Sequence, residues 1–183
     1  MKLLDILRES ISSNIYKITF NDDEFNIEES NLSEISKIPN LTYDMGGGET
    51  VYYPSSNVVA VDYIDVNDYA RWTLDEWGDE LSVKYYILQD LNIPFSFPKA
   101  NEIILSKVVI YIKNIEALAQ SVNNSLKPNG KIDFFAEHGK NTLSKKDINF
   151  LQILNEKYSF QFENNQTIDQ LKKDPTQMIY LKK

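Results

Sequence analysis

The sequence predicts an α/β protein built on a mostly parallel β-sheet. From residue 40 onward, short β-rich runs alternate with amphipathic helical stretches, an order typical of parallel strands joined by crossover helices. Several of these runs are continuously apolar, for example Val58–Val61, which is typical of strands covered on both faces. Glycines and aspartates follow the first runs, at the edge of the sheet where open α/β sheets bind ligands.

The composition limits the function classes. The chain has 183 residues, a formal charge of −8, one histidine and no cysteine. It is long enough for one domain with a sizeable core, and the missing cysteines exclude disulfides, thiolate metal sites and cysteine nucleophiles. The acidic balance disfavours binding to nucleic acid or an anionic membrane. With no apolar run of membrane-spanning length and no signal-peptide pattern, we expect a soluble, cytoplasmic protein.

The first part of the chain is expected to be a cap on the main domain. The apolar residues of segment 2–12 fall at helical spacing, and Ile15–Phe20 alternates as a short strand does. Polar residues around 22–24 and 28–31 are typical of loops. We therefore divide the chain into a cap, residues 1–39, and a main domain, residues 40–183.

The main domain is expected to hold seven strands, the last of them antiparallel, in a Rossmann-like three-layer sandwich. Helices are predicted over 66–78, over 114–126 with Asn114 as N-cap, and over 144–156, where Ser144 and Asp147 are spaced as in a capping box. Polar residues 163–176 join the last two strands. The strands are predicted at Leu41–Tyr43, Val58–Val61, Lys84–Leu88, Glu102–Leu105, Lys131–Phe135, Tyr158–Phe162 and Gln177–Leu181.

Three polar features follow the first three strands of this domain. The glycines of Asp44-Met45-Gly46-Gly47-Gly48 allow the backbone to approach a ligand closely. Asp62 ends the second strand and Asp90 follows the third, where carboxylates accept hydrogen bonds from ribose hydroxyls or cap a turn. A glycine loop with two strand-end acids predicts a nucleoside pocket.

These motifs resemble those of the class I S-adenosylmethionine-dependent methyltransferases over residues 40–183. The segment starting at Asp44 is similar to the D-x-G-x-G loop, Asp90-Leu91 resembles the acidic stretch at the adenine, and Leu126–Lys131 resembles the L-K-P-G-G segment before the fifth strand. The resemblance implies that S-adenosylmethionine is the cofactor. It implies cofactor contacts from Asp44, Gly46, Gly47, Gly48, Asp62, Tyr63, Asp90, Leu91 and Ser106.

The expected reaction is methyl transfer to a small molecule or a protein. His138, the one histidine, follows the fifth strand and is the candidate catalytic base for a hydroxyl acceptor; an exposed loop histidine is the alternative. No metal motif is present, so no metal is expected.

Two other functions stay open. Thr50 departs from the family's glycine pattern, and about thirteen residues separate the first two strands, which leaves little room for a crossover helix. A methyltransferase-like domain without catalysis, acting as a protein-interaction module of the immunity type, would accommodate both departures. A nucleotide-binding oxidoreductase is the third hypothesis, although the G-x-G-x-x-G pattern fails here.

Overall fold

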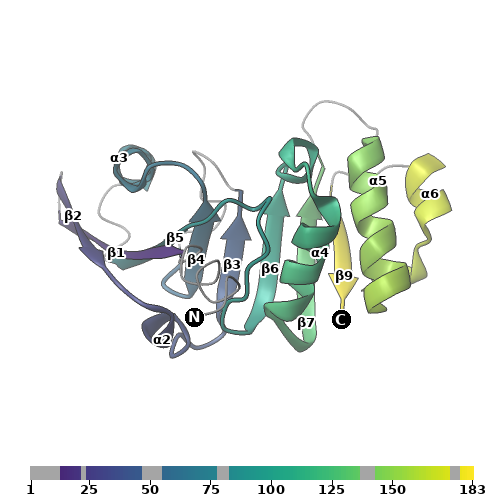
Figure 1. Cartoon of the computed structure of the whole chain (residues 1–183), viewed down its shortest axis with the longest axis horizontal. Coiled ribbons are helices and arrows are strands. Elements are labelled where there is room, and N and C mark those ends of the chain that lie inside the picture. The colour runs from purple at the N-terminus through teal and green to yellow at the C-terminus, as the bar shows by residue number, and fades with distance from the viewer. Residues whose placement is uncertain (1–12, 22–23, 47–54, 78–82, 137–142, 174–177) are drawn as a thin grey trace, which may run out of the picture.

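The chain folds into one twisted β-sheet with helices on both faces (Figure 1). The computed structural model describes residues 13–21, 24–46, 55–77, 83–136, 143–173 and 178–183. The helix predicted over 2–12 and most of the connection between the first two strands of the main domain lie outside these ranges. The described strands are β1 (Asn14–Asn21), β2 (Glu24–Glu29), β3 (Thr42–Met45), β4 (Val58–Asp62), β5 (Val83–Leu88), β6 (Ala100–Ser106), β7 (Leu126–Phe135), β8 (Gln161–Phe162) and β9 (Met178–Lys182).

The strand order is β2-β1-β5-β4-β3-β6-β7-β9-β8. The central strands β5, β4, β3, β6 and β7 are parallel, whereas β9 runs antiparallel to β7 and β8. This confirms the α/β class and the antiparallel C-terminal strand. The connection order reverses at β3, because the chain first moves outward to β4 and β5 and then returns to β6.

The seven-stranded sheet is not confirmed, because nine strands form the sheet in the described part of the chain. The two additional strands come from the N-terminal segment: β1 pairs antiparallel with β5, and β2 pairs with β1. The polar residues around 22–24 and 28–31, which predict loops, include both ends of β2. Phe25 and Ile27 nevertheless alternate with Glu24, Asn26 and Glu28, and both pack against a buried cluster.

Helices account for most of the connections. They are α2 (Leu32–Ile35), α3 (Val66–Trp77), α4 (Ile115–Asn124), α5 (Lys145–Gln152), α6 (Ile168–Lys173), the 3₁₀ turns η2 (Val109–Tyr111) and η4 (Glu163–Asn165), and the π-helical turn η3 (Ile153–Lys157). The predicted caps are confirmed: Asn114 accepts a hydrogen bond from the Ala117 amide, and Ser144 and Asp147 form a reciprocal capping box.

Several element boundaries differ from the prediction, and one helix was not predicted. The helix expected to reach 126 ends at Asn124, and β7 already begins at Leu126. Helix α5 ends at Gln152 and continues as η3, so only Gln161–Phe162 remains of the strand predicted from Tyr158. In the polar connection before β9, Thr167 caps the start of α6 through Gln170.

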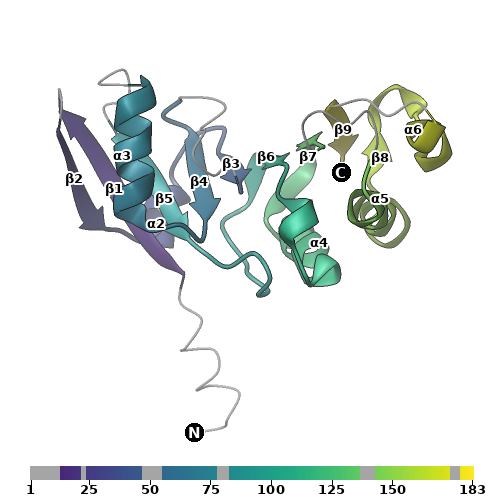
Figure 2. The ribbon, with the colours of Figure 1, turned by 90° about the horizontal axis from the view of Figure 1, so that it is seen from above.

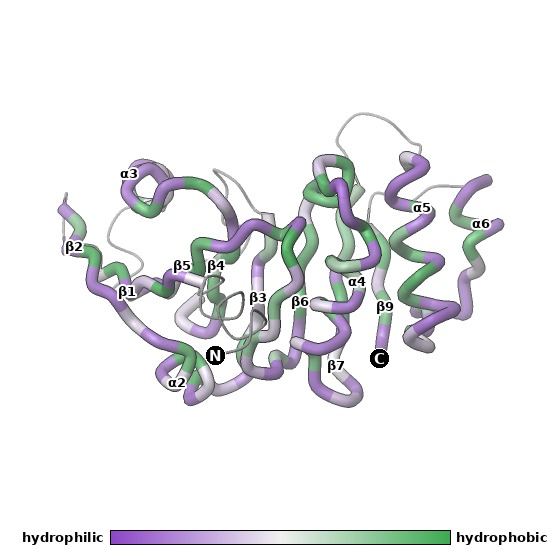
Figure 3. Tube along the Cα trace, in the orientation of Figure 1, coloured by the Kyte–Doolittle hydropathy of each residue, from purple (hydrophilic) through white to green (hydrophobic). Residues whose placement is uncertain are grey.

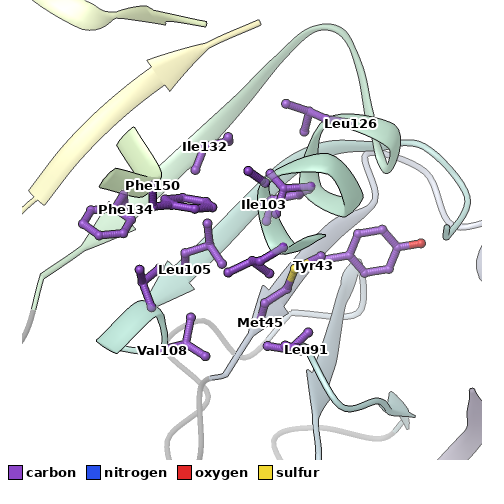
Figure 4. Packing of buried hydrophobic residues seen from close by; sticks show 14 of the residues in the cluster. Tyr43, Met45, Leu91, Ile103, Leu105, Val108, Leu126, Ile132, Phe134 and Phe150 are labelled. Carbon is purple, nitrogen blue, oxygen red and sulfur yellow. The ribbon is translucent and has the colours of Figure 1, made fainter. Parts of the chain in front are cut away.

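The core lies on both faces of the sheet. The larger cluster joins one face to α4 and α5, and Figure 4 shows Phe134 and Phe150 side by side there, with ring centroids 6.0 Å apart. The smaller cluster joins β1, β4 and β5 to α3. Because successive strand residues alternate between faces, Val59 belongs to the first cluster and Ala60 to the second. Hydrophobic residues follow the inner strands, whereas α6 is largely hydrophilic (Figure 3).

Candidate functional site

A cavity of about 440 Å³ lies at the carboxyl ends of β3, β4 and β5. We call it the strand-end cavity. It brings together five of the residues predicted to bind a cofactor: Gly46, Asp62, Tyr63, Asp90 and Leu91. The rest of its lining was not predicted and comes from Ile64, Asn92, Val108, Tyr111 and Ile112.

Gly46 forms the end of β3 at the cavity. Its amide donates to the Val61 carbonyl over 2.9 Å, and its φ of +72° lies in the left-handed region that favours glycine. A Cβ atom here would lie 2.3 Å from Val108 Cγ2, which is closer than carbon atoms approach. Both the backbone conformation and the packing against Val108 therefore favour glycine at this position. Gly47 and Gly48 lie outside the described residues.

Asp62 ends β4 and is 5% exposed. Its Oδ1 accepts a 2.7 Å hydrogen bond from the Tyr63 amide, and its carbonyl accepts from the Gln89 amide of the neighbouring chain segment. Tyr63, in contrast, is 74% exposed although it lines the cavity. The wall after β4 thus offers a fixed carboxylate next to an exposed phenol ring.

The loop after β5 is organised by Asp90. Its Oδ1 accepts hydrogen bonds from the amide and the side-chain nitrogen of Asn92, at 2.8 and 2.9 Å, as an Asx turn does. Asn92 Oδ1 in turn accepts from the Lys113 amide over 2.6 Å. This bond ties the loop after β5 to the loop before α4. The sequence Asp90-Leu91-Asn92 contains the Asx-turn signal, but no local pattern predicts that Asn92 binds the Lys113 amide.

The floor of the cavity is part of the main core. Leu91 is 3% exposed and packs with Val108 and Met45, and Figure 4 shows these three side chains at one end of the cluster. Val108 is followed by η2, which carries Tyr111, a residue 71% exposed at the cavity. Apolar atoms below and carboxylates at the wall suit a ligand with an apolar ring and hydroxyl groups.

Two predicted residues lie away from this lining. Asp44 and Ser106 are buried, on the sheet face opposite the one that Tyr43, Met45 and Leu105 present to the main core. Asp44 lies near Lys84, where burial lowers the pKa of the lysine to about 8 while the charge of Asp44 acts in the opposite direction. Asp44 therefore belongs to a buried polar environment on this face of the sheet.

The candidate catalytic residue, His138, lies outside the described residues. In the described part of the chain, no group of three or more histidine, aspartate or glutamate side chains is arranged to hold a metal ion. No helix of that part is long and apolar enough to cross a membrane.

Comparisons with known proteins identify the fold. No family model matches the sequence, and no curated protein matches it. Among solved structures, an antibiotic-resistance methyltransferase, Kmr, covers 91% of this chain and 98% of its own at 10% identity, with a TM-score of 0.54. A SAM-dependent methyltransferase from Aquifex aeolicus covers 82% and 85% at 15% identity, with a TM-score of 0.52. The fold is that of the class I methyltransferases.

The same fold also carries other activities. The [4+2]-cyclase SpnF covers 82% of this chain and 77% of its own at 10% identity, with a TM-score of 0.50. In this class I methyltransferase fold, the strand-end cavity lies where the connection order reverses at β3, the position at which open α/β sheets bind ligands. At such identities the likeness concerns the fold, and activity has to be argued from the site.

Proposed function

We propose that the strand-end cavity binds S-adenosylmethionine and that the protein transfers its methyl group to a small molecule or a protein. The observation that carries the proposal is the convergence of Gly46, Asp62 and Asp90 from three strand ends on one cavity. Asp62 is placed to accept hydrogen bonds from ribose hydroxyls, and Leu91 supplies an apolar surface for a base. The lining thus fits a nucleoside in size and in chemistry.

The chain's contribution to the reaction is mainly positional. When bound, the cofactor supplies an activated methyl group on a positively charged sulfur. The protein has to orient the acceptor in line with that methyl group and exclude competing geometries. Asp62 and Asp90 add negative charge around a cationic ligand. His138 is the proposed base for a hydroxyl acceptor, and Gly47, Gly48 and Tyr63 remain proposed cofactor contacts. Asp44 and Ser106, which lie away from the lining, are proposed to act on the cofactor only indirectly.

The test is calorimetric titration with S-adenosylhomocysteine. We expect saturable binding and a loss of about 1–3 kcal/mol in Asp62→Ala, the typical cost of losing charged hydrogen bonds. Asp68→Ala is the matched control, because Asp68 is exposed on α3 and does not line the cavity. Equal affinity of Asp62→Ala and wild type would remove Asp62 from the site.

The second candidate is a protein-interaction module that has lost catalysis. It is favoured by the short connection between Met45 and Val58, residues 46–57, which is at the lower limit of about a dozen residues for a parallel crossover and leaves little room for a helix. This function predicts no binding of S-adenosylhomocysteine at millimolar concentration, together with a stable complex with a protein partner. The same titration therefore separates the two candidates.

A further inference from the structure

A second cavity, of about 330 Å³, lies on the other face of the sheet, toward the amino ends of the strands. We call it the polar cavity. It shares no lining residue with the strand-end cavity and is walled by four strands, β3, β4, β6 and β7, and by Ser55 and Asn57 before β4. The side chains between its residues, Ile103 and Ile132, belong to the main core on the opposite face.

The strands turn an unusually polar side toward this cavity. Central parallel strands are generally apolar on both faces. Here Thr42, Glu102, Lys131 and Asp133 occupy neighbouring positions on one face, since Thr42 is paired with Glu102, and Glu102 with Lys131. Placing these groups within a sheet costs stability unless they are hydrogen-bonded or paired.

The charged groups form a compact arrangement with a surplus of negative charge. Lys131 Nζ lies 2.5 Å from Glu102 Oε1 and 3.6 Å from Asp133 Oδ2. One ammonium thus faces two carboxylates. The Asp133 side chain is only 10% exposed, and its Oδ1 has no hydrogen-bond partner within the described part of the chain.

The hydrogen-bond donors around the cavity are already engaged. The Thr42 hydroxyl is directed to the Asn40 carbonyl and Glu102, at 3.4 and 3.5 Å, and the Ser55 hydroxyl donates to Asn57 Oδ1. The Asn57 amide nitrogen donates to the Asn40 carbonyl over 2.8 Å. The carboxylates of Glu102 and Asp133 therefore remain as acceptors in the lining of the cavity, and a ligand that binds them has to bring donors.

We propose that the polar cavity binds a small organic cation whose guanidinium or ammonium group lies beside the carboxylates of Asp133 and Glu102. A cation balances the surplus charge, and its N–H groups donate to the two carboxylates of the lining. A guanidinium has five donors in a planar fork, which matches carboxylate oxygens well. This site is independent of the function of the strand-end cavity.

The titration of Asp133 gives the proposal a pH signature. Burial, and then the neighbouring Glu102, raise the pKa of Asp133 to about 6, although Lys131 acts against both. The other titratable side chains in register on this face are Asp44 of β3 and, on β9, Tyr180 beside Asp133 and the exposed Lys182 beside Lys131. Protonation of Asp133 removes the surplus charge, so we expect cation affinity to be about tenfold weaker at pH 5 than at pH 7.5.

The experiment compares n-butylguanidinium with its neutral isostere n-butylurea by calorimetric titration of the full chain at pH 7.5. We expect saturable binding of the cation and at least tenfold weaker binding of the urea. Asp133→Asn and Glu102→Gln should each lower cation affinity at least tenfold. Asp169→Asn is the control, because Asp169 is largely exposed on α6 and lies outside the cavity.

A direct readout on the wild-type protein covers the case in which the variants fail to fold. The ¹³C carboxyl resonance of Asp133, followed through a pH titration, should show a lower pKa when n-butylguanidinium is present. Equal binding of the cation and the urea, unchanged affinity in folded Asp133→Asn, or no saturable binding and no carboxyl response would each overturn the proposal. Saturable Ca²⁺ binding without cation binding would assign the cavity to a metal ion and overturn it as well.

Discussion

Gly46 carries two separate constraints at the residue scale. Its φ of +72° disfavours any side chain, and a Cβ would collide with Val108 Cβ at 2.4 Å as well as with Cγ2. The glycine is therefore explained by folding alone, whatever the cavity binds. Because it has no side chain, Gly46 also lets the end of β3 pack directly against Val108, the residue before η2.

We expect Gly46→Ala to lower the free energy of unfolding by about 2–4 kcal/mol, combining backbone strain with overpacking. Urea denaturation measures the change. In Gly46→Ala with Val108→Gly the collision is absent, so the double variant should lose less than the sum of the single losses. Strict additivity would show that Val108 is not the obstacle.

Lys84 is the second residue with an unusual environment. It is 1% exposed, its Nζ has no hydrogen-bond partner in the described part of the chain, and burial lowers its pKa to about 8. Between this value and the ordinary lysine pKa, the unfolded chain binds more protons than the folded one. Stability should therefore rise with pH in that interval, by about 2 kcal/mol from pH 8 to pH 10.

Urea denaturation at several pH values tests this expectation. Lys84→Met should abolish the rise, because the buried ammonium is gone, whereas Lys37→Met, an exposed lysine, should keep it. A wild-type curve that is flat over this range would mean that Lys84 keeps its charge in the fold without penalty.

At the scale of elements, the pairing of β6 with β7 brings Glu102 beside Lys131 and leaves Asp133 two pairs further along, on the same face. Because the pKa of Asp133 is raised to about 6, the folded state holds more protons than the unfolded state between about pH 4 and pH 6. Its contribution to stability is present below pH 4 and is lost as the pH rises through 6, a change of about 2 kcal/mol.

Asp133→Asn should remove this dependence, so the difference in unfolding free energy between variant and wild type should grow in favour of the variant from pH 4 to pH 6. Asp169→Asn on the exposed side of α6 is the control. A constant difference across that range would show an ordinary pKa for Asp133.

Elements with a local signal were predictable from the sequence. Asn114 and Ser144 mark helix starts through their own side chains, and apolar runs such as Val58–Val61 mark central strands. Strand β2 was not predictable, because its two apolar residues are buried only by packing against a cluster that includes α3, which lies far along the chain. The turn η3 forms where the chain leaves α5 toward β8. The direction of this exit is set by tertiary packing, and no local sequence pattern predicts it.

The candidate site also contains residues that a local sequence pattern predicts and residues that none predicts. Asp62 and Asp90 follow recognisable strands, and the rule for open sheets predicts that such ends converge. That Asp44 belongs to the opposite face follows from strand alternation once the boundary of β3 is known. Val108, Tyr111 and Asn92 line the strand-end cavity through contacts between loops that are distant in sequence, and no local pattern encodes these.

At the scale of the whole molecule, the hairpin β1–β2 extends the sheet at the end opposite β8 and α6 (Figure 2). It also completes the smaller core cluster, in which Ile18 is fully buried beneath α3. The division of the chain into residues 1–39 and 40–183 is thus a proposal about folding units, and it is testable through Ile18.

Ile18→Ala should cost about 2–5 kcal/mol of global stability, as expected for truncating a buried isoleucine. Lys17→Ala, on the other face of the same strand, should cost much less. Hydrogen exchange adds a spatial readout, since amide protection should fall in β1 and β5 together. A loss confined to β1 and β2, with unchanged global unfolding, would show that the hairpin unfolds as a unit of its own.

The hydrogen bond from the Lys113 amide to Asn92 has a consequence for the residence time of a ligand in the strand-end cavity. It joins the loop after β5 to the segment that enters α4, so these two rims of the strand-end cavity separate only when this bond breaks. Entry and exit of a ligand past these rims would then share one opening step. A change that weakens the bond would speed both directions and leave the equilibrium affinity nearly constant.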